Sequence, residues 1–426
     1  MSESVKRKPL HYGWVVAGAA FFALLASAGI RATPGVLILP LEHEFGWSAA
    51  TISSAIALNI VLFGLAGPFA AALMQRVGVR PVVAAALGFN SLAVAATMFV
   101  RQPWQLVLIW GVCVGLSTGL IANVLAATIA TRWFKTSRGV VVGLLSASVS
   151  TGQLVFLPLL ATLVAGPGWR VAVGVVAATA LLVAVPVVLL LREWPANLGI
   201  PPFGGTEIEL PPQSKGNPLL NALRELRAAA GARDFQLLAA TFFVCGASTN
   251  GLIGTHFIPA CGDHGIPEVK AAGFLAAMGV LDLLGTTFSG YLSDRMDSRI
   301  LLFWYYGLRG LSLLVLPAAL NLGDASLTLF TLFYGLDWIA TIPPTLKLTN
   351  AAFGTIKGPI LYGWIVASHQ LGAGAAALFA GIERTVFGTY DPSFWVSGVL
   401  CLIAAGLALA IGRKRLASLG PKPQTA

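Results

Sequence analysis

Long apolar stretches with almost no charge recur along the whole chain, and this pattern restricts the fold more than any other feature. The chain has 426 residues, of which 57% are hydrophobic and 10% are charged, whereas an ordinary soluble domain has about 25% charged residues. A helix needs about 20 apolar residues to cross roughly 30 Å of hydrocarbon. Because helices satisfy their own backbone groups in lipid, the sequence predicts an all-α membrane protein that crosses the bilayer many times.

We identify twelve such stretches, in two groups of six. The first group covers about residues 13–39, 50–74, 81–100, 104–130, 139–165 and 171–191. The second group covers about residues 235–260, 269–292, 300–320, 325–347, 360–381 and 392–411. The intervening "PANLGIPPFGGTEIELPPQSKGNP" predicts an irregular linker, and the residues after it predict a short amphipathic helix on the inner membrane face. We therefore expect an N-terminal bundle over residues 1–192, a linker over 193–234 and a C-terminal bundle over 235–426.

Lysine and arginine are distributed unevenly among the segments that join the spans. If the N-terminus lies inside, 21 of the 27 basic residues fall on the cytoplasmic side and four on the outer side. This asymmetry is the positive-inside bias, so the net charge of +10 indicates membrane topology and no nucleic-acid partner. We expect a protein of the cell inner membrane with both termini in the cytoplasm. The four cysteines lack the spacing of a metal site, and neither a metal nor a cofactor is expected.

The segment "GYLSDRMDSR", Gly290–Arg299, carries four charges between two apolar spans. The segment "AALMQRVGVR", Ala71–Arg80, occupies the corresponding place in the first half, 219 positions earlier. Two arginines align between the segments, while Gln75 stands where the later copy has Asp294. Matching position, sign and spacing indicate an internal repeat.

The later copy resembles the signature loop of the major facilitator superfamily, G-x-x-x-D-R-x-G-R. The resemblance implies twelve transmembrane helices in two pseudo-symmetric six-helix bundles, with this loop as a conformational latch. An acid near a helix end can hold a neighbouring helix by charge-assisted hydrogen bonds in one conformation only. The expected latch residues are Asp294, Arg295, Arg299, Arg76 and Arg80. Anchoring of the arginines at the inner surface is the alternative interpretation.

Three further segments are similar to the oxalate/formate antiporter and monocarboxylate transporter branch of that superfamily. They are "YGWVV" at Tyr12–Val16, "RWFKTSRG" at Arg132–Gly139 and "REWPANLGIPP" at Arg192–Pro202. The resemblance implies a carrier of small organic anions. One departure matters, because monocarboxylate transporters typically place an arginine one turn after the aspartate of the eighth span. Here Asp282 is followed by Thr286.

Charge inside a bilayer is costly unless it is paired or wetted, so charged residues within the spans are candidates for function. Arg31, in the first span, is the first candidate for holding an anionic substrate, since a guanidinium stays charged and can grip a carboxylate with two hydrogen bonds. Snorkelling to the outer interface is the alternative. Pro34 and Gly35 are expected to break the helix just beyond it. The other candidates for substrate binding are Asn59, Asn123, Gln153, His256 and His369.

Asp282 and Asp337 fall near the middle of the eighth and tenth spans and are the candidates for proton coupling. The two histidines, which titrate near neutrality, are further proton-carrier candidates. A fixed pair between Arg309 and one of the aspartates is the alternative, with the role of holding helices together. For each histidine a purely structural role is equally open.

These observations favour a secondary transporter that moves a small organic anion, a mono- or dicarboxylate, by alternating access. We expect proton coupling, uptake as the direction and a monomer. An efflux pump for amphiphilic compounds is the alternative, although the glycine-rich motif of drug/proton antiporters fails at Phe156 and Leu157. A membrane-embedded enzyme or sensor is the remote alternative, because the spans contain no metalloprotease, nucleophile-elbow or phosphate-loop motif.

Overall fold

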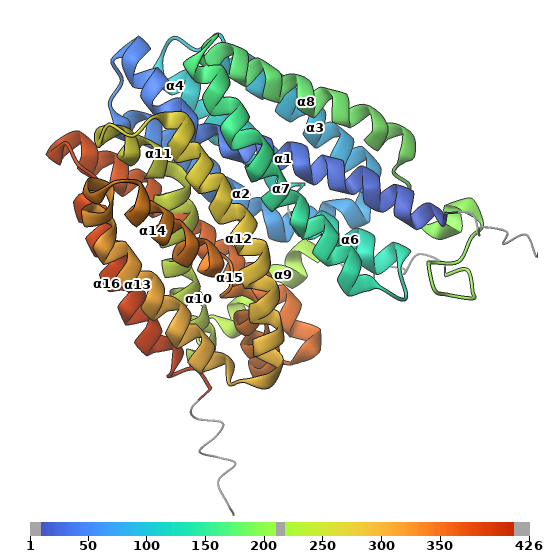
Figure 1. The fold of residues 1–426 in the computed structure, drawn as a ribbon. Coiled ribbons are helices and arrows are strands. Elements are labelled where there is room, and N and C mark those ends of the chain that lie inside the picture. The colour runs from blue at the N-terminus through green and yellow to red at the C-terminus, as the bar shows by residue number, and fades with distance from the viewer. Residues whose placement is uncertain (1–9, 122, 210–217, 413–426) are drawn as a thin grey trace, which may run out of the picture.

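A computed structural model describes residues 10–121, 123–209 and 218–412, and these residues are almost entirely helical (Figure 1). The first half of the chain forms six helical spans. They are α1 (Tyr12–Phe45), α2 (Ala49–Arg76), α3 (Val79–Thr97), the composite of α4 (Pro103–Leu106), η1 (Val107–Val114), α5 (Gly115–Gly119) and α6 (Asn123–Trp133), then α7 (Arg138–Ala165) and α8 (Trp169–Leu190). The short η2 (Pro195–Leu198) and the amphipathic α9 (Pro218–Ala229) lie between the halves.

The second half repeats the pattern. Its spans are the composite of α10 (Arg233–Gly246), η3 (Ala247–Ile253) and α11 (Gly254–Asp263), then α12 (Glu268–Arg295), α13 (Ser298–Leu322), α14 (Asp324–Asp337) with the first part of α15 (Ile342–Phe387), the second part of α15, and α16 (Asp391–Ala408). Gly354 has non-helical backbone angles and separates the two parts of α15. Its φ of 81° lies in the left-handed region that favours glycine, which allows the sharp turn.

All twelve predicted spans coincide with helical segments. Eleven described segments are long and apolar enough to cross a membrane, and α7, with 28 residues, supplies the twelfth. The sequence did not reveal that the fourth, seventh and tenth spans are interrupted. The fourth and seventh contain the π-helical stretches η1 and η3, and the tenth is broken between Asp337 and Ile342.

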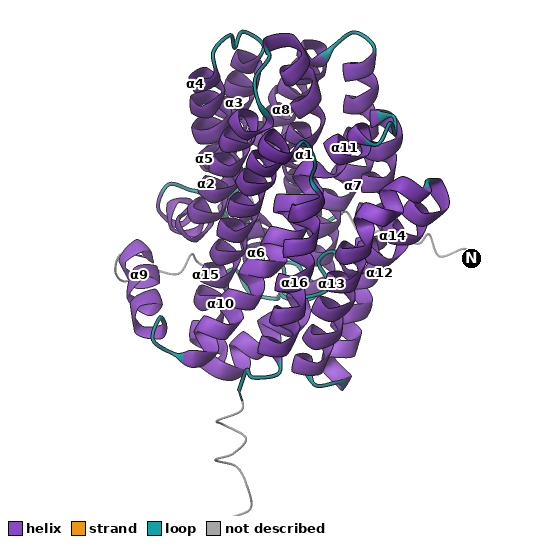
Figure 2. Ribbon diagram, turned by 90° about the vertical axis from the view of Figure 1, so that its left-hand side faces the viewer, coloured by secondary structure: helices purple, strands orange, loops and turns teal. Residues whose placement is uncertain are grey.

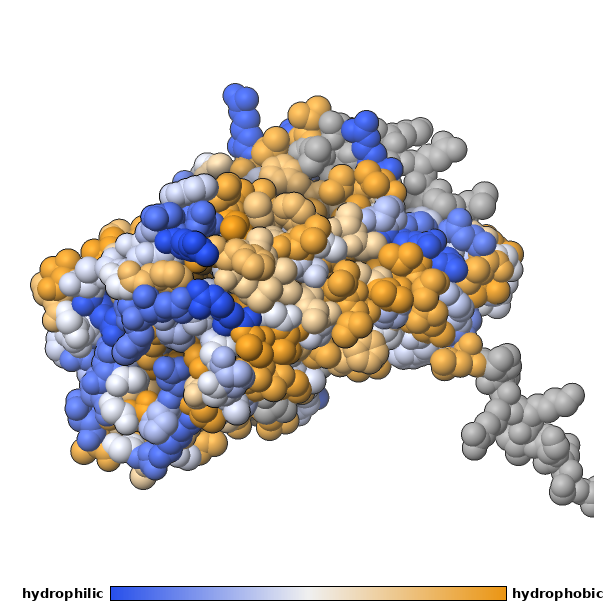
Figure 3. All heavy atoms as spheres, turned by 90° about the horizontal axis from the view of Figure 1, so that it is seen from above, coloured by the Kyte–Doolittle hydropathy of each residue, from blue (hydrophilic) through white to orange (hydrophobic). Residues whose placement is uncertain are grey.

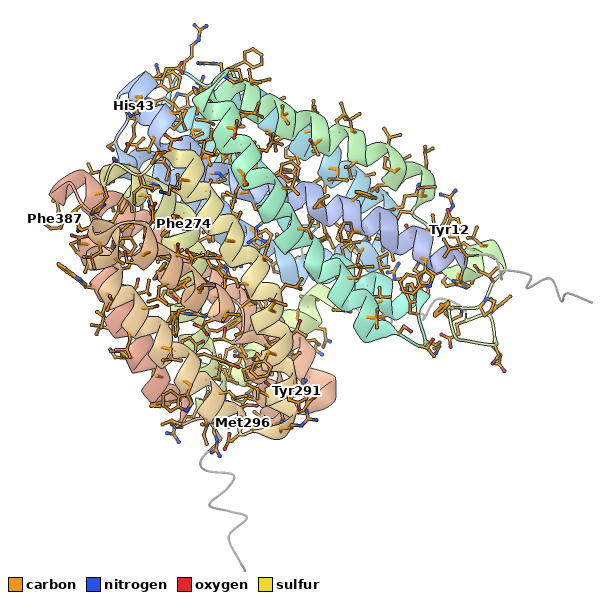
Figure 4. All side chains as sticks on the ribbon, viewed as in Figure 1. Tyr12, His43, Phe274, Tyr291, Met296 and Phe387 are labelled. Atoms are coloured by element: carbon orange, nitrogen blue, oxygen red, sulfur yellow. The ribbon has the colours of Figure 1, made fainter. Side chains whose placement is uncertain are left out.

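The six spans of each half pack into one arm, and the two arms meet at one end of the molecule (Figures 1 and 2). We call the end that carries residues 10 and 412 the terminal end, and the opposite end the distal end. Tyr12 and Met296 lie far apart on separate arms at the terminal end, whereas His43 and Phe387 lie at the distal end, where the arms converge (Figure 4). The arms contact each other mainly through α2 with α15 and α7 with α12.

Large apolar side chains face outward along the spans, as expected for a surface in contact with lipid. Leu182 is 71% exposed and Leu92 is 72% exposed, and contiguous apolar surface of this kind is rare on soluble monomers. Figure 3 shows hydrophobic residues over much of one face, with hydrophilic residues gathered mostly toward the left-hand side of the view.

The three segments that resemble the monocarboxylate transporter branch meet at the terminal end of the first arm. The backbone N–H of Phe203 donates to Trp133 O at 2.8 Å, and the N–H of Lys135 donates to Phe203 O at 2.9 Å. The Trp14 ring of α1 contacts the rings of Phe134 and Phe203, with centroid distances of 5.1 and 5.8 Å. The linker is thereby fixed to α1 and α6 by a strand-like pairing and an aromatic cluster.

Glu193, from the third of these segments, caps α3. Its carboxylate accepts the backbone N–H groups of Val79 and Arg80 at 2.6 and 2.9 Å, where the helix dipole favours negative charge. The same carboxylate lies 3.2 Å from the Arg132 guanidinium, which stacks over the Trp194 ring. Glu193 therefore ties the ends of α3 and α6 to the start of the linker.

The expected break at Pro34 and Gly35 is wrong, because α1 continues without interruption from Tyr12 to Phe45. Gly35 instead allows close packing between the arms. A Cβ atom at this position would lie 3.3 Å from the carbonyl oxygen of Gly254. The missing side chain lets α1 and α11 approach each other.

Gly285 offers a test of how closely α12 and α14 are packed. A Cβ atom added there would collide with the carbonyl oxygen of Leu336, whereas one added at Gly273 of the same helix would meet nothing within 4 Å. We predict that Gly285→Ala lowers the midpoint of thermal unfolding in detergent, because overpacking costs about 1–3 kcal/mol. Gly273→Ala is the matched control and should leave the midpoint unchanged or raise it. Equal midpoints for the two variants would contradict the close contact.

Candidate functional site

Arg31 lies near the middle of α1 and faces the region between the arms. At 1.5 Å per residue it is about 21 Å from the distal end of α1 and about 29 Å from its start. Its side chain is exposed, and its guanidinium stacks on the Phe63 ring of α2 at 4.5 Å. Among the side chains that the structure describes, none forms a hydrogen bond or an ion pair with it. A charged group of this kind can bind an anion that enters between the arms.

His369 of α15 approaches the same region from the second arm. It lies within electrostatic range of Arg31, and its ring centroid is 4.8 Å from that of Phe242 of α10. Its Nδ1 atom is buried and has no hydrogen-bond partner among the described residues. Arg31 and His369 therefore approach the same region from different arms, with the Phe63 ring beside Arg31 and the Phe242 ring beside His369.

The other expected binding residues are placed differently. His256 is completely buried at the contact of α11 with α15, where Nε2 lies 2.8 Å from Ala377 O and Nδ1 lies 3.2 Å from the Tyr390 hydroxyl. Asn59 of α2 is buried and donates to the carbonyl oxygen of Trp110, within η1, at 2.7 Å. Both side chains hold helices together. The side chains of Asn123 and Gln153 lie outside the described part of the chain.

Arg309 of α13 is fully buried and forms an ion pair with Asp337 of α14. Its Nε donates to Asp337 Oδ2 at 2.7 Å, and Nη1 donates to the Cys245 sulfur at 3.0 Å. Its Nη2 binds the backbone carbonyl oxygens of Asp337 and Trp338. This arrangement matches the alternative of a fixed Asp–Arg pair that holds helices together. Asn90, 219 positions before Arg309, accepts a hydrogen bond from Ser117 at 2.7 Å in the first arm, so the two halves use equivalent positions.

Asp282 of α12 lies beside this pair but does not form an ion pair with a described residue. Its Oδ1 accepts hydrogen bonds from the Thr286 hydroxyl at 2.9 Å and from the backbone N–H of Ile339 at 2.8 Å. Thr286, which stands in place of the arginine of the monocarboxylate transporter branch, is therefore a neutral donor to the carboxylate. Asp282 is the buried acid of the second arm that has no cation bound directly to it in the described structure.

The expected latch residues do not hold the two arms together in this conformation. Asp294 and Arg76 are exposed and have no hydrogen bond or ion pair with any described residue. Arg295 stacks on Tyr291, with 3.7 Å to the ring centroid. Arg80 meets Glu193 through its backbone N–H only, within one arm.

Arg299 is paired with Asp297 at the start of α13. The hydrogen bonds from Arg299 hold the pKa of the Asp297 carboxyl below its usual value. This pair therefore stays ionised at neutral pH, and it too lies within one arm.

Sequence reasoning missed the ion cluster that joins the arms at the distal end. Arg384, near the end of α15, places Nη1 2.6 and 2.7 Å from the two carboxylate oxygens of Glu42 at the end of α1. Its Nε and Nη2 donate to Asp263 at the end of α11 at 2.9 and 2.8 Å. Glu42 belongs to the first arm, whereas Arg384 and Asp263 belong to the second. We call these three residues the distal cluster.

A hollow of about 450 Å³ opens beside the distal cluster and is lined by Leu39, His43 and Glu268 together with Asp263 and Arg384. The only signal for the distal cluster in the sequence is that charged residues stand at the same end of three different spans. Their sequence separation of up to 342 positions gives no indication of which pair together.

The comparisons with known proteins identify the family. The chain matches the model of the Major Facilitator Superfamily over residues 19–358. The chain belongs to the Major Facilitator Superfamily, and it is a multi-pass membrane transporter rather than an enzyme.

Curated relatives agree with the narrower resemblance. The chain is 26% identical to monocarboxylate transporter 13 of Bos taurus over 405 residues, which cover 94% of this chain and 89% of that protein. It is 28% identical to monocarboxylate transporter 11 of Homo sapiens, with 96% and 85% covered. It is 24% identical to the uncharacterised MFS-type transporter YcxA of Bacillus subtilis (strain 168), with 93% and 94% covered.

Solved structures confirm the twelve-helix fold. A bacterial homologue of the human lysosomal transporter Spinster, in an inward-facing and unoccupied conformation, superposes with a TM-score of 0.74 at 16% identity, covering 96% of this chain and 98% of that chain. A D-xylose–proton symporter superposes with a TM-score of 0.72 at 15% identity, covering 93% and 97%.

Removal of the Arg384 charge should loosen the distal end. We predict that Arg384→Gln increases labelling of a cysteine placed at Leu39 by a membrane-impermeant maleimide several-fold, because two carboxylates lose their shared cation. Lys270→Gln is the control, since the Lys270–Asp324 pair is also at the distal end but lies within the second arm. Identical labelling in both variants would show that the distal cluster does not hold the arms together.

Removal of one partner of the Arg309–Asp337 pair should destabilise the protein more than removal of both. We predict that Asp337→Asn lowers the free energy of unfolding by about 3–5 kcal/mol, because it leaves a buried cation without a counter-charge. The double variant Arg309→Met with Asp337→Leu should recover a large part of that loss. Thermal unfolding followed by tryptophan fluorescence measures both effects, and a double variant less stable than Asp337→Asn would count against the pairing as the cause.

Proposed function

We propose that this transporter carries small organic anions, with one carboxylate as the group that is recognised, and that it couples their movement to protons. The single observation that carries the proposal is the state of the two intramembrane arginines. Arg309 is occupied by Asp337 and by backbone carbonyls. Arg31 is an exposed residue whose guanidinium stacks on the Phe63 ring, and it lies within electrostatic range of His369 of the other arm.

The surroundings of Arg31 favour a monocarboxylate over a dicarboxylate. One guanidinium matches one carboxylate with two parallel hydrogen bonds, and the Phe63 ring on which the guanidinium stacks suits an apolar body. His369 can supply a further hydrogen bond from the other arm. The names of the relatives, among them monocarboxylate transporters 13 and 11, agree with this substrate class.

Asp282 is the proposed proton site. A neutral hydroxyl and a backbone N–H hold its carboxylate, so protonation breaks no ion pair, in contrast to protonation of Asp337. Asp282 and Arg31 stand on different arms, and rocking of the arms between two conformations would expose both to one side and then the other. In this scheme the distal cluster closes one side and the Asp294 latch acts in the opposite conformation.

The asymmetry of lysine and arginine supports an orientation with the terminal end in the cytoplasm and the distal end outside. The protein would then reside in the inner membrane and catalyse uptake. The distal cluster would be the outer closure, and the diverging arms at the terminal end would face the cytoplasm.

Uptake by proteoliposomes tests the substrate class. With acetate, pyruvate, benzoate and oxalate as labelled substrates, we predict uptake of monocarboxylates that is stimulated by an inward proton gradient. Arg31→Gln should weaken apparent affinity by roughly 10- to 100-fold, since a lost charge-assisted contact is worth about 1.5–3 kcal/mol. Arg31→Lys should retain part of the affinity, because it keeps the charge but loses the two parallel hydrogen bonds.

Arg101→Gln is the control for a change of net charge, because Arg101 is an exposed arginine in the distal loop between α3 and α4. Uptake of no anion would overturn the substrate class. Export of amphiphilic dyes that is unaffected by Arg31→Gln would favour the efflux pump instead. Anion uptake that does not change with the proton gradient would support the proposed anion carrier and contradict the proposed proton coupling.

A further inference from the structure

The tenth span is broken at Trp338–Thr341, between α14 and α15, and its backbone groups need partners at a depth where lipid supplies none. In the break the N–H groups of Trp338, Ala340 and Ile342 bond three residues back, to Gly335, Asp337 and Ile339. The N–H of Ile339 leaves this pattern and points to another helix. An unsatisfied N–H inside a membrane protein costs several kcal/mol.

Side chains of two neighbouring helices satisfy the break. Asp282 of α12 accepts the N–H of Ile339 at 2.8 Å, and Ser289 of the same helix donates to Ala340 O. Arg309 of α13 donates to the carbonyl oxygens of Asp337 and Trp338. The break is thus held by one anion, one hydroxyl and one cation, and the anion is the member that can be neutralised by a proton.

We propose that Asp282 is a proton-sensitive cap of the break in the tenth span: its ionised carboxylate holds the Ile339 amide strongly, and its protonated form holds that amide more weakly. The proposal deepens the proton coupling suggested above by naming the element that responds to the proton. Asp282 is a positioning residue in this role, since it acts on the substrate region through the tenth span.

The charged groups around Asp282 are compatible with such a response. Arg309 of α13 and Asp337 of α14 are the charged groups within electrostatic range, and they are bound to each other. Of the residues described in α7, α11 and α15, none places a charged or titratable side chain in contact with the Asp282 carboxylate. Protonation of Asp282 therefore changes the charge at the break while the Arg309–Asp337 pair stays in place.

The position of the two hydrogen bonds explains why the charge of Asp282 affects its hold on the Ile339 amide. The same oxygen, Oδ1, accepts both the Thr286 hydroxyl and the Ile339 N–H. Hydrogen bonds to an ionised acceptor are roughly twice as strong as those between neutral groups. A neutral acid would keep Thr286, its neighbour one turn away on α12, and would hold the amide of the other helix more weakly.

Hydrogen exchange of the Ile339 amide tests the proposal without any transport measurement. The purified full-length protein in nanodiscs is exchanged from about pH 8 to about pH 5, and single-amide rates are corrected for intrinsic exchange. In the unaltered chain we expect protection of Ile339 to fall by roughly tenfold on acidification, the factor for loss of the charged share of one hydrogen bond. Asp282→Asn, which keeps an acceptor oxygen without the charge, should show the lower protection at every pH.

Thr286→Val is the matched control, because it removes the other hydrogen bond to Oδ1 and leaves the charge, so Ile339 should stay protected at high pH. Asp324→Asn at the start of α14 controls for loss of an acid elsewhere on the same span and should leave the protection of Ile339 unchanged.

The cap would be overturned if protection of Ile339 were independent of pH in the unaltered chain and equal in Asp282→Asn and Thr286→Val. If Asp282→Asn does not fold, the pH series of the unaltered chain decides by itself. Failure of proton-driven uptake with the exchange effect intact would reject the proposed coupling and still support the cap.

Discussion

The structure depends on one constraint, which is that the bilayer interior offers no water to a charge or to a free backbone group. Arg309 illustrates the usual solution, since every direction of its guanidinium is used, toward the Asp337 carboxylate, the Cys245 sulfur and two backbone carbonyls. Arg31 is the exception, because its charge is left to the space between the arms. The contrast between the two arginines distinguishes a structural charge from one available to a ligand.

The same constraint governs the interrupted spans. The fourth span contains the π-helical η1, where Asn59 of α2 binds the carbonyl oxygen of Trp110. The tenth span is broken completely, and α12 and α13 supply its partners. In each half, therefore, the second span of the bundle satisfies a backbone group of the fourth. The first half uses a neutral amide for this purpose and the second half uses a carboxylate, so the halves share an architecture but differ in the group that can carry charge at this contact.

The two ends of the molecule are held by different means. At the distal end Arg384 joins acids of both arms, whereas at the terminal end none of the ion pairs between described residues joins one arm to the other, as the Arg132–Glu193 pair illustrates. Contacts across the arms in the middle rely on small residues, for example Gly35 against Gly254. This difference between the ends supports the proposed alternating access, in which the arms would separate at one end while each bundle stays packed.

The sequence by itself determined the twelve spans, their grouping in two halves and the superfamily, because hydropathy and loop motifs are local properties of the chain. It also singled out Arg31, Asp282, Arg309 and Asp337, since any charge within an apolar span is conspicuous. Which of these bind each other depended on rotation of the spans about their axes, which periodicity in an almost uniformly apolar helix does not reveal. The uninterrupted α1, the break in the tenth span and the distal cluster of Glu42, Asp263 and Arg384 were likewise decided only by the tertiary structure, because they arise from close approach of helices distant in sequence.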